Sequence, residues 1–181
     1  MLRIFDFLFS LFGLILGGPA LLVIYVIGLF DTGSPIFRQE RVGRDQKPFT
    51  LVKFRTMRPD TASVASHLAD ASAITPLGAF LRRTKLDELP QLWNVLKGEM
   101  SLVGPRPIVQ AELARYGDDV DYFLMVRPGM TGLWQVSGRN DVDYDTRVYL
   151  DTWYVKNWSL WYDVAILFKT VRVVFARKGA Y

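Results

Sequence analysis

The chain has 181 residues, half of which are hydrophobic, and it carries a formal net charge of +4 with a sequence pI of about 9.4. This length fits one domain. The high hydrophobic content points to a membrane. The basic charge favours lipid headgroups or phosphates as partners. The chain has no cysteine and one histidine, His67, so disulfides, Cys/His zinc sites and cysteine nucleophiles are excluded. A Ser-His-Asp triad would need His67, which lies in a small, polar run typical of a surface loop.

The first predicted element is the apolar segment 4–30. Asp6, near its start, is the only charged residue in it. As a straight helix it would be roughly 40 Å long at ~1.5 Å per residue, against a hydrocarbon core of about 30 Å. It could therefore span a membrane with tilt. However, Gly17-Gly18-Pro19 lies at its centre, and a proline inside a helix removes a backbone donor and predicts a kink. Each half is then too short to cross alone.

Positive charge flanks this apolar segment on both sides, at Arg3, Arg38, Arg41 and Arg44. The positive-inside tendency therefore places both ends in the cytoplasm. A helix that enters the membrane, bends at Pro19 and returns to the same face fits these features, and a plain spanning helix with a tolerated proline is the alternative. The residues alone leave both open. A cleaved signal peptide is not expected, because the apolar run is too long and no small-residue cleavage site follows it.

Residues 48–57 alternate in the manner of a β-strand. Lys53 and Arg55 have the same parity and so project from one face of that strand, either toward a site or as solvated charges at a sheet edge. Further along, Thr75 followed by Pro76 is typical of a helix start.

From residue 87 onward the pattern predicts short helices joined by loops. The segment 87–98 has a proline in its first turn and a glycine at its end, which indicates a second short helix. Helices are also expected over 108–116 and 120–126, and the glycine-rich segment 127–140 is expected to be loop or short strand. Because the rest of the chain is mostly helical in pattern, the predicted fold class is α+β, mostly helical with a small β-hairpin.

The C-terminal region is rich in aromatic rings that suit headgroup depth, at Tyr149, Trp153, Tyr154, Trp158, Trp161 and Tyr162. Residues 164–175 are apolar but too short to span, and they carry Lys169 and Arg172. Such a segment lies in the plane of the membrane interface as an amphipathic helix or, alternatively, packs in a protein core.

Asp87 and Glu88 form an adjacent acidic pair at the start of the predicted helix 87–98. A helix N-terminus stabilises an anion, so helix capping is one interpretation. Two adjacent carboxylates repel each other unless a cation lies between them, and Mg²⁺ prefers one or two carboxylates plus substrate phosphates. Several cations lie near the pair in the sequence: Arg82, Arg83, Lys85 and Arg106, the last of which is held between two prolines. Metal-binding carboxylates beside a rigid guanidinium suit phosphoryl transfer.

Four stretches carry a resemblance over nearly the whole chain: "KFRTM", "LRRTKLDELPQLWNVLKGEMSLVGPRP", "RPGMTGLWQVSGRN" and "NWSLWYDVAILFKTV" with the closing "KGAY". Together with the broken apolar segment, they resemble the bacterial sugar transferases, the monotopic phosphoglycosyl transferases that begin O-antigen, capsule and exopolysaccharide synthesis. The Asp-Glu-Leu-Pro-Gln-Leu and Gly-Pro-Arg-Pro blocks are long and ordered, which makes this resemblance specific.

The resemblance implies roles for particular residues. Asp87 occupies the position of the nucleophile that attacks the β-phosphate of a UDP-sugar, giving a phosphosugar-aspartyl intermediate and UMP, and Glu88 that of the residue that holds Mg²⁺. The other positions that match active-site residues of the family are Lys53, Arg82, Arg106 and the late acidic residue Asp163. Family members bend the membrane helix at a proline, where Pro19 stands here.

The resemblance also implies partners and a location. The expected partners are a UDP-hexose, undecaprenyl phosphate and inner-membrane lipid, and no nucleic acid. Residues 1–30 would form a re-entrant membrane helix, and residues 31–181 a catalytic unit on the cytoplasmic face of the bacterial inner membrane. The ends "SGRND" and "RKGAY" favour a hexose such as galactose or glucose. Some relatives carry extra membrane helices before this unit, so the chain is expected to be a minimal enzyme or a catalytic core.

Two other functions stay open at this point. A non-enzymatic scaffold would use the basic face to bind anionic lipid, with the acidic pair as a helix cap. A membrane-bound nucleotide-sugar hydrolase or phosphatase would use the same metal and nucleophile without a lipid acceptor. The sequence does not determine which sugar is used, the oligomeric state (a homodimer is compatible), or the roles of Gln135 and Arg139.

Overall fold

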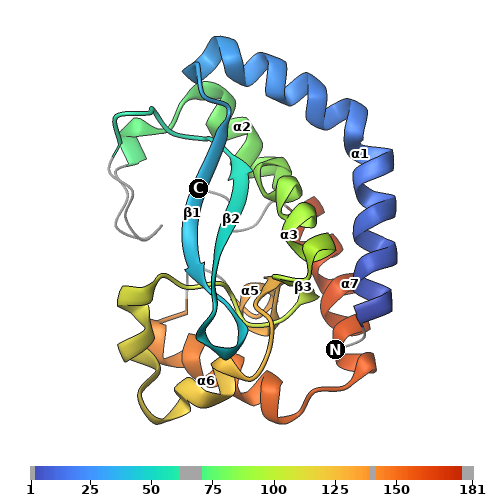
Figure 1. Ribbon diagram of the computed structural model, residues 1–181, viewed down its shortest axis with the longest axis vertical. Coiled ribbons are helices and arrows are strands. Elements are labelled where there is room, and N and C mark those ends of the chain that lie inside the picture. Colours follow the sequence, from blue (N-terminus) through green and yellow to red (C-terminus); the bar gives the residue numbers. More distant parts are fainter. Residues whose placement is uncertain (1–2, 62–70, 139–141, 177–181) are drawn as a thin grey trace.

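The computed structural model describes residues 3–61, 71–138 and 142–176 (Figure 1). His67 and Arg139 lie outside the described residues. The described part is mostly helical with two small two-stranded sheets, which confirms the predicted α+β class.

The apolar segment forms α1 (Arg3–Thr32), a single helix of 30 residues that contains Pro19. The prediction that the helix is broken at Pro19 is therefore wrong, because helical structure continues through the proline. Figure 1 shows instead that α1 changes direction near its middle. A proline removes one hydrogen bond and crowds the preceding turn, which bends a long helix without ending it.

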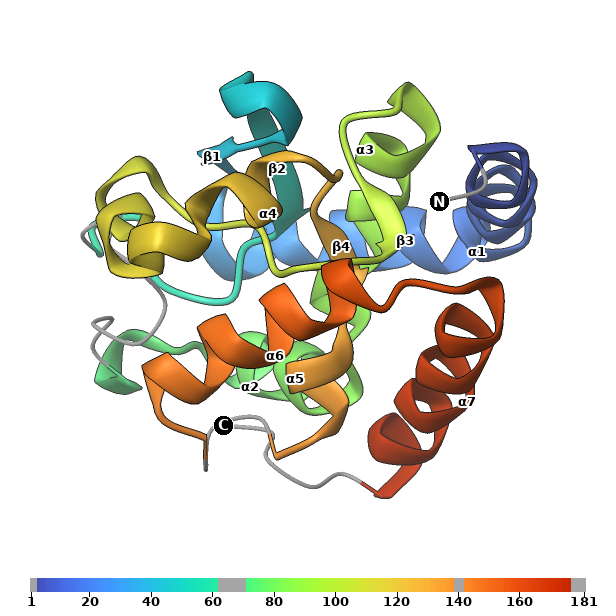
Figure 2. The same ribbon diagram turned by 90° about the horizontal axis from the view of Figure 1, so that it is seen from below.

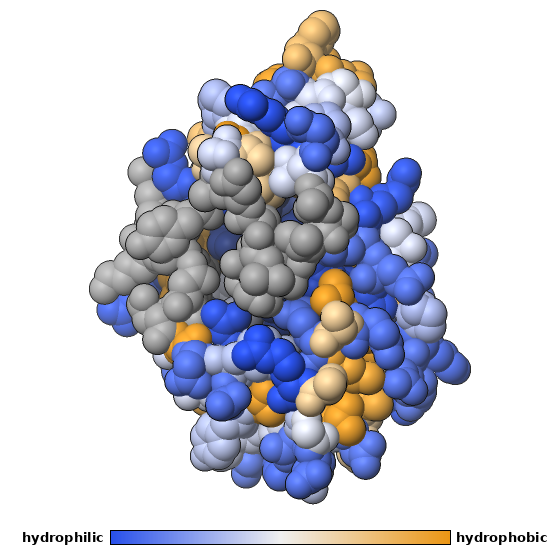
Figure 3. Space-filling view, turned by 90° about the vertical axis from the view of Figure 1, so that its left-hand side faces the viewer, coloured by the Kyte–Doolittle hydropathy of each residue, from blue (hydrophilic) through white to orange (hydrophobic). Residues whose placement is uncertain are grey.

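Most of α1 is not covered by the rest of the protein. Within the described residues it is the one helix long and apolar enough to cross a membrane, and 11% of its most apolar 18-residue window is buried. A core helix of a soluble protein would be mostly covered. Figure 3 shows that the face to the left in Figure 1 is by contrast largely hydrophilic. The molecule therefore has a polar side and an apolar helix that needs another apolar environment.

Both ends of α1 are fastened to the remainder of the protein. Near its start, the Asp6 carboxylate is 4% exposed and accepts hydrogen bonds from Ser101 Oγ at 2.9 Å and from the Leu102 backbone N–H at 3.0 Å. Near its end, Thr75 Oγ1 donates to Asp31 Oδ2 at 2.7 Å. The one charged residue inside the predicted apolar segment is thus compensated by protein donors rather than by water.

The predicted hairpin is confirmed. Strand β1 (Ile36–Val42) pairs antiparallel with β2 (Pro48–Phe54), with Ile36 opposite Phe54 and Val42 opposite Pro48. The strand ends three residues earlier than expected. Asn94 covers the outer edge of β2, because its side chain accepts from the Val52 N–H at 3.1 Å and donates to the Thr50 carbonyl at 2.8 Å.

The helix start at Thr75-Pro76 is confirmed, since α2 (Pro76–Thr84) begins there and Thr75 Oγ1 accepts from the Gly78 N–H at 2.9 Å. The single helix expected over 87–98 is instead two elements, a 3₁₀ helix η4 (Leu86–Gln91) and then α3 (Leu92–Lys97). The tighter first part contains Pro90, which lacks the N–H that an α-helical turn would use. Gly98 ends α3 with φ +87°, as its C-terminal position predicts.

The middle of the chain differs most from expectation. The helix expected over 108–116 is a 3₁₀ helix η5 (Gln110–Asp119), and the next helix is the shorter α4 (Val120–Leu124). The glycine-rich segment contains the strand β4 (Gly129–Thr131) and an unexpected short helix, α5 (Leu133–Val136). Strand β4 pairs parallel with β3 (Ser101–Val103), a long-range pairing that no local pattern indicates.

The chain ends in α6 (Tyr144–Lys156) and α7 (Leu160–Ala176), as the helical pattern predicts. Figures 1 and 2 both show α7 on the same side of the molecule as the N-terminal part of α1. The aromatic group is divided: Tyr154 is 2% exposed in a core with Val103 and Ile166, which corrects its expected place at the headgroups, whereas Trp161 is 80% exposed.

Candidate active site

Asp87 lies in the first turn of η4, and its side chain is 6% exposed. Its Oδ1 atom is buried and has no hydrogen-bond partner within the described part of the chain, and no side chain caps the start of η4. The capping interpretation needs a carboxylate that accepts from the helix N-terminus, so this geometry counts against it. A buried carboxylate oxygen without a partner is costly, and such atoms concentrate at functional sites.

The pKa of the Asp87 carboxyl is raised to about 6, first by burial and then by the charge of Glu88. Lys53, Lys85 and Arg82 oppose this by favouring the ionised form. At pH 7 a carboxyl of this pKa is still ionised by about ten to one, so it remains available as a nucleophile.

Lys53 connects the acidic pair to the arginines. It lies on β2 opposite Phe37, with Nζ 5.3 Å from the centre of that ring. Burial lowers the pKa of its ammonium to about 8, Asp87 and Glu88 raise it, and Arg106 lowers it. The Lys53 ammonium therefore interacts electrostatically with both the acidic pair and Arg106. Arg55 lies 5.6 Å from the same ring, as the shared parity predicts, but its Nε donates to the Ser34 carbonyl at 2.8 Å.

Arg82 approaches the pair from the last turn of α2. Its Nε donates to Thr56 Oγ1 at 2.9 Å, and Thr56 is itself buried. Burial lowers the pKa of the guanidinium and Asp87 raises it, so the two charged groups attract each other. On the other side of the pair, Lys85 Nζ lies 3.5 Å from Glu88 Oε1. The predicted set of Asp87, Glu88, Lys53 and Arg82 is thus brought together.

Arg106 lies in the Gly-Pro-Arg-Pro segment, which several elements hold in place. The Gly129 N–H donates to the Pro105 carbonyl at 2.7 Å, and a guanidinium N–H of Arg41 donates to the Pro107 carbonyl at 3.0 Å. The Arg106 guanidinium lies 5.7 Å from the Trp134 ring centre. The predicted rigidity of this arginine is therefore a property of its neighbours as well as of its flanking prolines.

The sequence reasoning missed a second group of charges around Arg106. Arg147, on α6, lies 4.6 Å from the same Trp134 ring, and Arg41 is 5% exposed on β1 with Glu112 at 3.9 Å. Arg41 was interpreted only as a positive flank of the apolar segment. Neither residue has a spacing that marks it, so no signal within one sequence would have found them.

Asp151 is the buried acid of this second group. It is 2% exposed, and Tyr116 Oη donates to its Oδ2 at 3.0 Å. Burial raises the pKa of Asp151 to about 8, although Tyr116, Arg106 and Arg147 all favour the ionised form. Trp134, Arg106, Arg147 and Asp151 thus form one compact group, which we call the Trp134 cluster.

The hydrogen bonds of the Asp163 side chain go to residues outside both of these groups. Tyr154 Oη donates to its Oδ1 at 2.5 Å and Trp158 Nε1 to its Oδ2 at 3.0 Å, and burial raises the pKa of the carboxyl. These bonds join α6 to the start of α7. None of its described interactions reaches Asp87, so its predicted place in the substrate site stays a prediction. Gln135, whose role the sequence does not determine, donates from Nε2 to the Met130 carbonyl at 3.2 Å.

The acidic pair suits a magnesium ion. Asp87 and Glu88 are adjacent carboxylates that interact electrostatically, and Asp87 Oδ1 has no hydrogen-bond partner among the described residues. Within that same part of the chain, no three or more histidine or acidic side chains gather. Substrate phosphate oxygens would therefore have to complete the coordination, which is the way Mg²⁺ is commonly held.

Comparison with known proteins identifies the family of this chain. The family model of the bacterial sugar transferases matches residues 1–177, and the chain belongs to that family. It is 53% identical over 99% of its length to a UDP-galactose-lipid carrier transferase of Erwinia amylovora, and 54% identical over 99% to an undecaprenyl-phosphate galactose phosphotransferase of Salmonella typhimurium. The chain spans 41% of the length of each of these two relatives. An exopolysaccharide production protein of Sinorhizobium fredii is 43% identical over 99% of the chain and 87% of the relative.

Proposed function

We propose that this protein is a phosphoglycosyl transferase that moves a hexose 1-phosphate from a UDP-sugar to undecaprenyl phosphate, the first membrane step of a bacterial surface polysaccharide. The observation that carries this proposal is the buried Asp87 carboxylate, whose Oδ1 has no partner among the described residues while Lys53 and Arg82 face it. The names of the relatives supply the substrate classes, and galactose is the sugar named for two of them.

The reaction proceeds in two displacements. An Asp87 oxygen attacks the β-phosphorus of the UDP-sugar, the bond from that phosphorus to the bridging oxygen breaks, and UMP leaves with the electron pair. A phosphate oxygen of the lipid acceptor then attacks the same phosphorus, and the bond to Asp87 breaks. This division has a physical advantage, because the soluble sugar nucleotide and the apolar acceptor need not be bound together.

The cations of the site make this chemistry feasible. An anionic nucleophile and a diphosphate repel each other, so the transition state needs positive charge held in place before the reaction. Lys53 and Arg82 provide it beside Asp87, and Arg106 provides it from its rigid segment. A Mg²⁺ held by Glu88 and Asp87 would neutralise phosphate charge and orient the leaving group.

We infer that α1 re-enters the membrane from the cytoplasmic face. A helix that spans a bilayer separates its ends by about 30 Å on opposite sides. Here Asp6 near one end contacts β3, and Asp31 near the other contacts the N-cap of α2, so both ends rest on the same body. The bend of α1 agrees with this topology. Cysteines replacing Leu2 and Asp45 should then react with an impermeant reagent from the same side, and reaction from opposite sides would refute re-entry.

The covalent step has a direct test. The purified protein is incubated with radiolabelled UDP-galactose and Mg²⁺ but no lipid, and is then separated by denaturing electrophoresis. We expect label on the wild-type band and none on Asp87→Asn. Release of free sugar phosphate without lipid would favour the hydrolase, and undiminished polysaccharide synthesis in cells that carry Asp87→Asn would favour the scaffold.

A further inference from the structure

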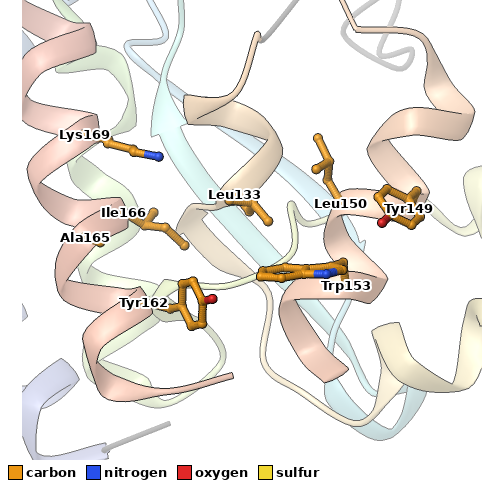
Figure 4. Close-up of a pocket in the computed structure, with 8 residues that line it drawn as sticks. All are labelled: Leu133, Tyr149, Leu150, Trp153, Tyr162, Ala165, Ile166 and Lys169. Carbon is orange, nitrogen blue, oxygen red and sulfur yellow. The ribbon is translucent and has the colours of Figure 1, made fainter. Parts of the chain in front are cut away.

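A cavity of about 390 Å³ opens between α5, α6 and α7, and its lining residues have no role so far in the proposed chemistry (Figure 4). Leu133, Leu150 and Ile166 supply aliphatic wall, Trp153 and Tyr162 supply aromatic wall, and Lys169 supplies the one charged side chain. Trp153 and Tyr162 meet edge to face at 5.4 Å, which closes one end. A cavity of this size is within the range of about 300–1,000 Å³ typical of ligand sites.

The character of the wall restricts what fits. Figure 4 shows the Lys169 side chain reaching from α7 toward the centre of the cavity, across from Leu133 and the side chains of α6. An apolar wall with a single inward cation favours a ligand that has an apolar chain and an anionic group. A nucleotide sugar, which is polar over its whole length, would leave its hydroxyl groups without partners in such a cavity.

The cavity lies beside an exposed apolar face of α7. The helix that forms one of its walls also exposes Trp161, Phe168 and Val171, which are 80%, 74% and 54% exposed. These residues project from a face of α7 next to the cavity face, so a lipid-inserted α7 would bring the cavity mouth to the acyl region. A lipid is therefore the kind of molecule that reaches this site without crossing water.

The cavity also lies back to back with the Trp134 cluster. In α5, Leu133 lines the cavity, whereas the next residue, Trp134, stacks against Arg106 and Arg147. In α6, Leu150 lines the cavity, whereas Arg147, three residues earlier, belongs to the cluster. The apolar part of an occupant would thus lie among the residues of the cavity. Lys169 on one side and Arg147 on the other would place positive charge next to it.

We propose that this cavity binds the lipid acceptor: the prenyl chain of a polyprenyl phosphate lies along the apolar wall, and the cations on either side attract its phosphate. The inference rests on the proposed function, since it assigns the acceptor of that reaction.

The first experiment measures binding without catalysis. The protein, in vesicles of phosphatidylethanolamine and phosphatidylglycerol, is irradiated with a diazirine-bearing prenyl phosphate, and the labelled peptides are mapped. We expect label on α6 and α7, displaced by undecaprenyl phosphate and not by added phosphatidylglycerol. Asp87→Asn should be labelled as well as the wild type, so failure of the covalent mechanism would not affect this result.

The variants place the site. Ala165→Trp fills the cavity from an exposed position on its wall, and Lys169→Gln removes the inward charge without adding bulk. Each should lower photolabelling and raise KM for undecaprenyl phosphate by about tenfold, equivalent to about 1.4 kcal/mol, with KM for the UDP-sugar unchanged. Arg172→Gln is the matched control for Lys169→Gln, on the same helix but outside the cavity, and should have neither effect.

Three outcomes would overturn the proposal. Equal displacement by phosphatidylglycerol would show a general lipid surface. Labelling that is unchanged in both Ala165→Trp and Lys169→Gln would place the acceptor elsewhere. Loss of a dimer in Ala165→Trp, without loss of labelling, would show that a second copy of the chain covers this face.

Discussion

The acidic pair and the Trp134 cluster both concentrate charge, but they are assembled in different ways. Asp87, Glu88, Lys85 and Arg82 lie within seven residues of one another, between α2 and η4. The Trp134 cluster takes Arg106 from the segment after β3, Trp134 from α5, and Arg147 and Asp151 from α6. The short sequence separation brings the first group together, and Thr56 then holds Arg82 in place, whereas the second group exists only when those elements pack. The two should therefore respond differently to substitution: the first in chemistry, the second in stability as well.

The largest expected effect is on the chemistry of the acidic pair. Asp87→Asn removes the proposed nucleophile, and transfer should fall by at least about 10³-fold, as expected for loss of an essential catalytic group. The variant should unfold at the same temperature as the wild type or higher, because a buried carboxylate with a raised pKa disfavours folding. Transfer is measured as label in the lipid fraction. A large fall in melting temperature would instead make Asp87 a structural residue.

Metal removal is expected to have the next largest effect. Chelation with EDTA should abolish measurable transfer, and added Mg²⁺ should restore it, because the acidic pair and the diphosphate otherwise repel each other. Glu88→Gln should need more Mg²⁺ for half-maximal activity than the wild type. Full activity in EDTA would remove the metal from the proposal and leave the nucleophile in place.

The comparison between the two groups becomes sharper at Arg41, which positions Arg106. Arg41→Met breaks its bond to the Pro107 carbonyl and leaves the partly buried Glu112 without this cation. We expect a loss of about 2–3 kcal/mol in the free energy of unfolding, on the scale of removing one partner of a buried charged hydrogen bond. Transfer activity should fall too, because Arg106 loses a support.

The matched control for this change is Arg44→Met, three residues further along. Arg44 contacts Asp45 at 3.5 Å with both side chains at least half exposed, and exposed pairs contribute little. Thermal unfolding of both variants measures the difference. Equal melting temperatures would mean that the burial of Arg41 has no energetic consequence.

The prediction with the smallest expected effect on transfer is a pH dependence of stability in the Trp134 cluster. Asp151 has a pKa of about 8 in the folded protein against an ordinary value of 3.8, so between these values the unfolded state is ionised while the folded state holds the proton. Stability should therefore decline as pH rises from about 4 to about 8. Asp151→Asn keeps the shape of the side chain but removes the titrating carboxyl group. The stability of this variant should therefore decline less over the same pH range. Unfolding at pH 5 and pH 8 tests it, and equal slopes for the two proteins would contradict the raised pKa.

The boundaries of helices illustrate how much of the fold can be predicted from the sequence. Thr75-Pro76 and Gly98 mark boundaries that the structure confirms, because capping and left-handed φ depend on the residue and its immediate neighbours. The parallel pair β3–β4 and the helix α5 were missed, since a three-residue strand and a four-residue helix are shorter than any periodicity can reveal. Whether α1 continues through Pro19 is not fixed by the residues, which fit both a bent re-entrant helix and a spanning helix with a tolerated proline. A proline weakens a helix, and the surroundings decide whether it ends there.

The sequence by itself determined the acidic pair, the long apolar segment and the family, because these depend on which residues stand next to one another. Only the tertiary structure decided that Lys53 of β2 faces Asp87, that both ends of α1 rest on one body, and that Arg41 supports the segment of Arg106. Those contacts join residues far apart in the chain. Their formation depends on how whole elements pack together, and packing is set by the shapes and charges of many side chains at once rather than by any short run of residues.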